Sequence, residues 1–263
     1  MSRPVALITG ASGGIGLELA RLAAKEGHDL VLVARSTAKL EEVAKYLTGM
    51  YSISAQVLTA DLADPAAPQA IVDELGRRGL SGVDVLVNNA GFGDWGLFGR
   101  ADLARQLAMI QVNVTALTAL TRLLLPAMVT QRKGRILNVA STAGFAPGPL
   151  MAVYYATKAY VISFSEALSN EFEGTGITVT VLCPGPTRTG FAEVAGMGQS
   201  NLFSSPNVMA VEPVALAGWR GMRRGTPMVV PGFANKVLLQ AIRISPRWLL
   251  RRITRWFQEG RAQ

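Results

Sequence analysis

A tyrosine and a lysine in the stretch VYYATKAY (residues 153–160) are spaced for acid–base chemistry. Of the tyrosines in this stretch, only Tyr154 has a lysine, Lys158, four residues further on. Residues four apart share one face of a helix, so the two side chains enter the same space. An ammonium about 5 Å from a phenol, at an effective dielectric of about 20, favours the phenolate by roughly 3 kcal/mol, or about two pKa units. Tyr154 is therefore predicted to exchange a proton with a substrate near neutral pH.

Ser141 is a candidate partner of Tyr154, at the end of the apolar run GRILNVAS (134–141). Its hydroxyl would donate a hydrogen bond to a substrate oxygen on which negative charge develops. A serine can also act as a nucleophile, but the only histidine, His28, belongs to the turn KEGHDL at the far end of the first predicted helix. We therefore predict that Ser141 polarises a substrate oxygen and that His28 is a surface turn residue. The sequence predicts no metal site.

The glycine-rich stretch TGASGGIG (residues 9–16) lies between an apolar run at 5–9 and a predicted helix at 15–26. Glycines allow a tight turn and let the backbone approach a pyrophosphate, which the free N–H groups of a helix N-terminus bind. These glycines would also suit an ordinary turn, but the strand before and the helix after favour a dinucleotide site. The predicted contacts to the dinucleotide are Thr9, Gly10, Ser12, Gly14, Ile15 and Gly16.

The end of the second predicted strand bears on which dinucleotide is bound. NAD-binding folds commonly place an acid there, bonded to the ribose 2′-OH. The segment VLVARSTAKL has no acid, and Arg35 stands in that place. A guanidinium binds a 2′-phosphate in fork geometry, which favours NADP(H) over NAD(H); the alternative is that Arg35 is a solvated turn residue. Asp61 after the third strand, and Asn89, Ala90 and Gly91 after the fourth, are expected to border the adenine side of the same site.

Strand-like and helix-like segments alternate along the chain, which predicts one doubly wound α/β Rossmann domain. Apolar, β-branched runs without polar alternation indicate parallel strands that are buried on both faces and covered by helices. Seven such strands are predicted, at 5–9, 29–34, 55–60, 84–88, 134–141, 177–183 and 227–231. The predicted helices are 15–26, 37–48, 65–78, 102–130, 153–173 and 212–223. We place the catalytic domain at 1–244, with a substrate lid near 186–211 that begins with a short helix, and a C-terminal extension at 245–263.

Taken together, these motifs make the chain similar to the short-chain dehydrogenase/reductase family from about Val5 to Gly232. The resemblance rests on TGxxxGxG at 9–16, NNAG at 88–91, Asn113 in QVNVTA, Ser141, the YxxxK pair Tyr154 and Lys158, and PGPTRT at 184–189. It implies an enzyme in which Asn113, Ser141, Tyr154 and Lys158 are catalytic. It also implies a homodimer or homotetramer formed through the helices near 102–130 and 153–173.

The resemblance also assigns individual roles around the nicotinamide. Lys158 would hold the ribose hydroxyls beside Tyr154, and Asn113 would anchor a water in a proton relay from Lys158 to solvent. A simpler alternative for Asn113 is a helix-interior amide satisfied by a neighbouring carbonyl. Pro184 and Gly185 would fix the chain beside the nicotinamide, and Thr189 would bond its carboxamide.

Large apolar residues on the expected loops suggest an apolar or aromatic substrate, although such residues often only pack a loop. They are Phe92, Trp95, Phe145, Met151, Met197, Leu202 and Phe203. We therefore predict an NADP(H)-dependent carbonyl reductase or alcohol dehydrogenase acting on an apolar ketone, aldehyde or secondary alcohol. The alternatives are a non-catalytic NADP(H) sensor and a membrane-surface or nucleic-acid-binding scaffold built on the C-terminal extension.

The net charge of +8 is concentrated in residues 219–263, which include that extension. Residues 219–263 hold 10 of the 26 Lys and Arg but one of the 18 acids, so nucleic acid is not expected as a partner of the domain itself. Residues 245–258, SPRWLLRRITRWFQ, form a predicted basic amphipathic helix, whose composition is typical of a segment that lies on an anionic membrane surface. The alternative is an apolar face buried on its own domain or on a second subunit.

The expected compartment is the cytosol, with this helix as a possible peripheral membrane contact. Cys183 is the single cysteine, so no disulfide can form within the chain. The N-terminus lacks the apolar core of a secretory signal, and the charge-free stretch 106–121 is too short and too polar to predict a membrane span.

Overall fold

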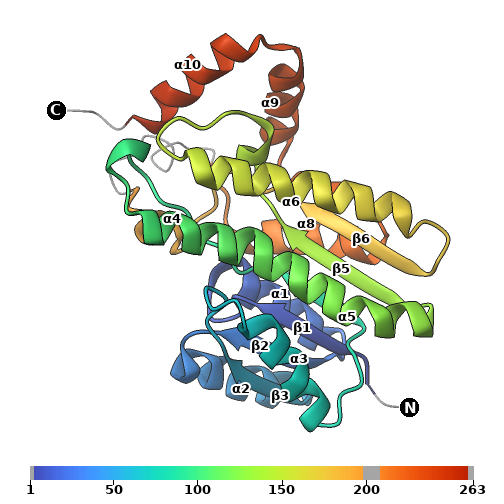
Figure 1. Cartoon of the computed structure of the whole chain (residues 1–263). Helices are drawn as coiled ribbons and strands as arrows, with labels where there is room; N and C mark the ends of the chain where they lie inside the picture. The colour runs from blue at the N-terminus through green and yellow to red at the C-terminus, as the bar shows by residue number, and fades with distance from the viewer. Residues whose placement is uncertain (1–2, 198–207, 260–263) are drawn as a thin grey trace.

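The computed structural model describes residues 3–197 and 208–259 as a seven-stranded parallel sheet in the order β3-β2-β1-β4-β5-β6-β7, with helices on both faces (Figure 1). The predicted fold class is confirmed. The order in which the chain adds strands reverses between β1 and β4, which in open α/β sheets is the point where ligands bind, outside the carboxyl ends of the strands. The strands are β1 (Val5–Thr9), β2 (Asp29–Ala34), β3 (Ala55–Thr59), β4 (Val85–Asn88), β5 (Gly134–Val139), β6 (Ile177–Leu182) and β7 (Met228–Val229).

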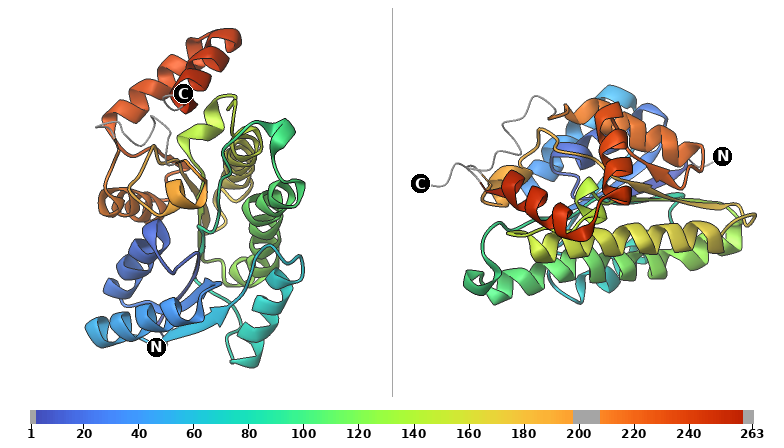
Figure 2. Two further views of the ribbon diagram at one scale, coloured as in Figure 1. Left: turned by 90° about the vertical axis from the view of Figure 1, so that its left-hand side faces the viewer. Right: turned by 90° about the horizontal axis from the view of Figure 1, so that it is seen from above.

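The first strand shows why these runs are continuously apolar. Ala6 and Ile8 pack into one core, whereas Leu7 packs into the core on the opposite face of the sheet. Because helices cover both faces, successive side chains are all buried and no polar alternation is needed. The first core lies under α1 (Gly14–Lys25), α2 (Thr37–Tyr51) and α8 (Val211–Arg223), and the second under α3 (Ala67–Arg77), α5 (Leu117–Gln131) and α6 (Ala152–Glu171) (Figure 2).

The long helix predicted at 102–130 is interrupted. It consists of α4 (Leu103–Ile110), a π-helical segment (Gln111–Ala116) and α5. Insertions of this kind in an α-helix frequently occur at functional sites, and Asn113 lies within this one. By length and composition alone, Leu103–Gln131 is also the one described helix that could cross a membrane. Here it packs along α3 and α6 on the sheet (Figure 1).

Buried amides join the central strands to the helices behind them. Asn88 Nδ2 donates to Thr121 Oγ1 at 3.0 Å and to Asn138 Oδ1 at 2.9 Å, and Asn138 Nδ2 donates to Ser165 Oγ at 2.9 Å. These contacts connect β4 and β5 with α5 and α6. They fix the ends of the strands from which the residues of the predicted site project.

The chain ends in two helices, α9 (Phe233–Ile244) and α10 (Arg247–Gln258), which form a hairpin beside the carboxyl edge of the sheet (Figure 1). The sequence predicted α10 but not α9. It placed the residues of α9 in the catalytic domain and predicted no helix or strand for them. In α9, Phe233, Val237 and Ile244 are exposed, whereas Asn235 and Leu239 are buried. The predicted lid contains one described helix, α7 (Phe191–Val194), whereas Leu202 and Phe203 lie outside the described residues.

Candidate active site

Tyr154, Ser141 and Lys158 meet at the carboxyl ends of β5 and β6. Tyr154 lies in the first turn of α6, and Lys158 lies one turn later; both are buried. Lys158 Nζ donates to Val139 O at 2.8 Å, so the ammonium is held at the end of β5. Ser141 follows this strand, and its hydroxyl is close enough to the Tyr154 phenol to act on the pKa of that phenol. The structure thus brings the predicted phenol, hydroxyl and ammonium together.

The pKa of Tyr154 differs from the sequence prediction. Burial raises the pKa of Tyr154 above its ordinary value, and the Ser141 hydroxyl opposes that rise without overcoming it. Burial also lowers the pKa of Lys158 to about 8. The lowering of the Tyr154 pKa that was predicted from Lys158 is therefore not seen. The physical reason is that desolvation of the phenolate outweighs the attraction of an ammonium directed at Val139.

Backbone groups around Ser141 fix the orientation of its side chain. Its Oγ accepts from Ala143 N at 3.1 Å and donates to Pro184 O at 3.4 Å. Thr142 N also donates to Pro184 O, at 2.9 Å. The turn after β5 is thereby joined to the turn after β6, and the hydroxyl is held beside the phenol.

Asn113 reaches the same site from the π-helical segment. Its Nδ2 donates to Phe92 O at 3.0 Å and to Thr157 Oγ1 at 3.1 Å, and its Oδ1 accepts from Phe92 N at 3.1 Å. A Cβ on Gly91 would lie 3.0 Å from Asn113 Oδ1 and 3.4 Å from Lys158 Nζ, so both groups border this glycine. The Asn113 amide is satisfied by a neighbouring carbonyl and by Thr157, which is the simpler alternative considered from the sequence. It also lies beside Lys158.

The glycine turn has the shape that a pyrophosphate site requires. Gly10 and Gly14 have φ of 66° and 55°, which favour glycine, and a Cβ on Gly16 would collide with Gly10 O. No side chain caps the N-terminus of α1, so its first N–H groups have no side-chain acceptor. The residues present therefore fit a dinucleotide phosphate.

Thr9 and Asn89, predicted as contacts of the dinucleotide, connect the ends of β1 and β4. Thr9 Oγ1 accepts from Asn89 N and from Ala90 N, each at 3.0 Å. Asn89 Nδ2 donates to Thr9 O at 2.9 Å and to Gly10 O at 3.2 Å. These bonds fix the glycine turn relative to the end of β4.

Further out on the same edge, Arg35 follows β2 and Asp61 follows β3, and both side chains are exposed. Asp61 Oδ1 accepts from Ala63 N at 3.0 Å. On the opposite side of the glycine turn, a Cβ on Gly14 would lie 3.2 Å from Thr189 Cγ2, and Gly185 lies against Asn235 of α9. The segment 184–189 therefore closes over the start of α1.

An apolar cluster surrounds Tyr154. Phe191 of α7 lies 5.1 Å from Tyr154 between ring centroids. The other members from the predicted set are Phe92, Trp95, Met151 and Met197, whereas Phe145 packs in a separate cluster under α6. This cluster gives the reacting hydroxyl apolar surroundings.

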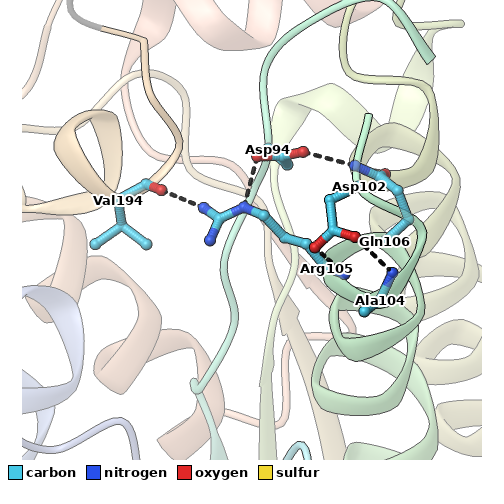
Figure 3. A network of polar contacts seen from close by, with 6 residues as sticks. All are labelled: Asp94, Asp102, Ala104, Arg105, Gln106 and Val194. Atoms are coloured by element: carbon cyan, nitrogen blue, oxygen red, sulfur yellow. Dashed lines mark hydrogen bonds and ion pairs between the residues drawn. The ribbon is translucent and has the colours of Figure 1, made fainter. Parts of the chain in front are cut away.

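A polar network that the sequence analysis missed holds the wall of this cluster together (Figure 3). Arg105 Nε and Gln106 Nε2 both donate to the carboxylate of Asp94, each at 2.6 Å, and Arg105 Nη2 donates to Val194 O at 2.5 Å. Asp102 caps α4 by accepting from Ala104 N and Arg105 N. The network joins the loop after β4 to α4 and α7. Its only signal in the sequence was a charged residue, Arg105, among the apolar residues of LARQLAMI.

Comparison with known proteins identifies the family. Residues 4–199 match the family model described as short chain dehydrogenase. The chain belongs to the short-chain dehydrogenase/reductase family. It is therefore an oxidoreductase that moves hydride between a nicotinamide dinucleotide and a carbonyl or alcohol carbon. His28, which was predicted to lie in a surface turn, is half-buried and packs against the ring of Trp219.

Three relatives illustrate the similarity. The chain is 40% identical over 209 residues to a ketoacyl reductase of the monensin polyketide synthase of Streptomyces virginiae, covering 76% of this chain and 77% of that protein. A short-chain dehydrogenase from Sphingobium yanoikuyae in complex with NADPH is 36% identical, with a TM-score of 0.82 and coverage of 91% and 93%. The bulky-bulky ketone specific alcohol dehydrogenase of Comamonas testosteroni is 32% identical, with a TM-score of 0.77 and coverage of 92% and 93%.

Among residues 3–197 and 208–259, no group of three His, Cys, Asp or Glu side chains could hold a metal ion. The single cysteine, Cys183, is buried at the end of β6, as expected for a strand residue.

Proposed function

We propose that this short-chain dehydrogenase/reductase is an NADP(H)-dependent carbonyl reductase or alcohol dehydrogenase acting on an apolar ketone, aldehyde or secondary alcohol. The observation that carries the proposal is a phenol, Tyr154, beside Ser141 and buried among apolar side chains within one helical turn of Lys158. A protein that only senses the dinucleotide has no need of this arrangement.

The dinucleotide would be held by the glycine turn and the segments that border it. The phosphates fit the uncapped start of α1, and the nicotinamide end fits beside Pro184, Gly185 and Thr189. When bound, the nicotinamide supplies or accepts the hydride. The predicted residues Ser12, Ile15, Asp61 and Gly91 belong to the same edge of the sheet.

In carbonyl reduction, Tyr154 gives its proton to the substrate oxygen and Ser141 donates a hydrogen bond to it. The raised pKa of Tyr154 keeps the phenol protonated and ready to act as an acid. Ser141 stabilises the negative charge that develops on oxygen. Lys158 stabilises the resulting phenolate. Asn113 borders Gly91 together with Lys158, and it would anchor the water through which a proton passes between solvent and Lys158 to restore the phenol.

The preference for NADP(H) rests on Arg35. Its exposed guanidinium follows β2, where an acid would repel a 2′-phosphate, and a guanidinium binds phosphate in fork geometry. The structure of the Sphingobium yanoikuyae relative in complex with NADPH supports the same choice.

The apolar substrate is supported by the cluster around Tyr154 and by the bulky-bulky ketone specific relative from Comamonas testosteroni. Assays with purified protein, NADPH or NADH, and a panel of aryl and alkyl ketones test the proposal. Turnover of bulky apolar ketones with NADPH supports it. NADPH binding without turnover of any carbonyl or alcohol would instead favour the sensor.

The exposed apolar side chains outside the site point to a second proposal, that α10 meets an anionic membrane surface. Trp248, Ile253 and Trp256 are 55%, 43% and 66% exposed, so this apolar face is not covered by the domain. The residues from 233 to 258 hold six cations and no acid, which disfavours pairing with a second copy of itself. Sedimentation with phosphatidylcholine vesicles, with and without phosphatidylglycerol, tests it: binding that requires the anionic lipid supports the proposal.

We also propose that the protein forms a homo-oligomer and that it is located in the cytoplasm, as the sequence predicts. Leu103, Leu107 and Ile110 form an exposed apolar stripe on α4, and Tyr160 of the neighbouring α6 is also exposed. Analytical ultracentrifugation of the wild type and a Leu103→Lys/Leu107→Lys variant measures whether this stripe holds two copies together.

A further inference from the structure

The last turn of α10 is fastened to the apolar cluster around Tyr154. Gln258, 1% exposed, accepts with its backbone oxygen from Trp95 Nε1 at 3.0 Å. Its side-chain Nε2 donates to the Tyr155 hydroxyl at 2.7 Å. One residue thus bonds to the loop after β4 and to α6, although it lies 163 and 103 residues away along the chain.

Both partners of Gln258 belong to the cluster that contains the reacting phenol. The ring of Tyr155 lies 6.1 Å from that of Tyr154 between centroids, and Trp95 packs in the same cluster. Trp95 N also donates to Ala195 O at 3.0 Å, next to α7. The end of α10 therefore completes the wall of the site on the substrate side. The sequence analysis had placed it in a separate extension.

The amide of Gln258 is buried but incompletely satisfied. Within the described residues, its Oε1 is one of the buried side-chain atoms that have no hydrogen-bond partner, and the Nε2 of the same amide contacts Tyr155 of this cluster. If the amide were turned over, the hydroxyl of Tyr155 would satisfy the oxygen and leave the nitrogen without a partner. Either way, one polar end of a buried amide needs a further group, because leaving it unpaired is costly. A hydroxyl can serve in both cases, since it donates and accepts.

We propose that Gln258 is a specificity residue whose amide binds a hydroxyl group of the carbonyl substrate, at a distance from the reacting carbonyl. This rests on the proposed function, because it supplies a second polar contact to the substrate of the same site. The apolar cluster holds the body of such a substrate, while Ser141 and Tyr154 bind its carbonyl oxygen and Gln258 its hydroxyl.

Matched ketones test this inference, since a methyl group has nearly the size of a hydroxyl but makes no hydrogen bond. Two such pairs are 4-hydroxyacetophenone with 4-methylacetophenone, and 4-(4-hydroxyphenyl)-2-butanone with 4-(4-methylphenyl)-2-butanone. We would measure kcat and KM for each pair with the full-length wild type and with Gln258→Leu. Gln240→Leu is the control, because it makes the same change at an exposed position of α9.

In Gln258→Leu, kcat/KM for the hydroxyl ketone of at least one pair is expected to fall about tenfold relative to its methyl partner, mainly through KM. Gln240→Leu leaves the ratio unchanged. Tyr155→Phe, which removes one bond of the amide and keeps the ring, is a second variant should Gln258→Leu fail to fold. It is expected to change the same ratio in the same direction.

An equal loss for hydroxyl and methyl ketones would show that Gln258 only fastens α10, and would overturn the inference. So would ratios within twofold of wild type in both pairs. These outcomes differ from failure of the proposed function, in which the wild type itself reduces no ketone of the panel.

Discussion

Lys158 Nζ lies 5.8 Å from the centre of the Tyr154 ring while it donates to Val139 O at 2.8 Å. The ammonium is near the phenol but is directed at the backbone of β5. Burial acts on both groups, raising the pKa of Tyr154 and lowering that of Lys158 to about 8. Each shift favours the neutral form, so the protein holds a protonated phenol beside an ammonium that loses its proton readily.

This pairing predicts how carbonyl reduction depends on pH. A lysine whose pKa is lowered from 10.5 to about 8 keeps its charge below pH 8 and loses it as pH rises through 8, whereas the phenol stays protonated throughout. With saturating NADPH, kcat/KM for reduction is therefore expected to be constant at neutral pH and to fall as pH rises above about 8. Lys133→Met, which removes an exposed lysine that pairs with Asp84, is expected to keep the same profile. A constant rate up to about pH 9.5 would contradict this role of Lys158.

The glycine turn offers a pair of matched substitutions. In Gly16→Ala, the new methyl group would collide with Gly10 O and with Asn89 Nδ2, which is expected to lower the free energy of unfolding by about 1–3 kcal/mol. NADPH binding is expected to weaken more than tenfold, because the shifted turn no longer fits the phosphates. Gly13→Ala meets no atom within 4 Å and has an extended backbone, so it should resemble wild type. Fluorescence titration with NADPH and thermal unfolding measure both effects.

Arg35→Asp tests the choice of dinucleotide. The carboxylate would repel a 2′-phosphate, so the KM for NADPH should rise at least about tenfold while the KM for NADH falls or stays constant. Arg100→Asp is the control, because it makes the same change of charge at an exposed position 65 residues away from Arg35 in the sequence. Equal changes for both dinucleotides would show that Arg35 does not contact the 2′ position.

The network of Asp94, Arg105 and Val194 predicts an effect on substrate rather than on fold (Figure 3). The ion pair is partly exposed, so Arg105→Met should change the free energy of unfolding by no more than about 1 kcal/mol. However, it releases α7, which carries Phe191 against Tyr154, and KM for bulky ketones is expected to rise several-fold. The exposed Arg122→Met serves as control. Unchanged KM in Arg105→Met would mean that α7 is held by its apolar contacts alone.

Much of this fold was predictable, because each strand reports its own environment. Runs such as VALIT and ITVTVL are apolar at every position since both faces of the sheet are covered. The predicted strands all formed, with boundaries within two or three residues at most ends. The phenol, hydroxyl and ammonium were predictable from spacing, because one helix and one strand end set their positions.

What the sequence could not reveal depends on contacts between distant segments. The helix α9 was missed although Phe233, Val237 and Ala241 recur at helical spacing, and the exposure of Phe233 and Val237 shows that this apolar face does not pack into the core. The contact of Gln258 with Trp95 and Tyr155 follows only from the path of the α9–α10 hairpin. The pKa of Tyr154 was assigned the wrong direction because desolvation depends on burial, which an i, i+4 spacing does not measure.

The central claim, that Tyr154 transfers the proton, is tested most directly by single-turnover assays and NADPH titration of Tyr154→Phe, with Tyr160→Phe as control. Tyr160 lies on the same helix but is 40% exposed. We predict that Tyr154→Phe binds NADPH as wild type does while its rate of ketone reduction falls about a hundredfold to ten-thousandfold. Ketone reduction by Tyr154→Phe at the wild-type rate would contradict the mechanism.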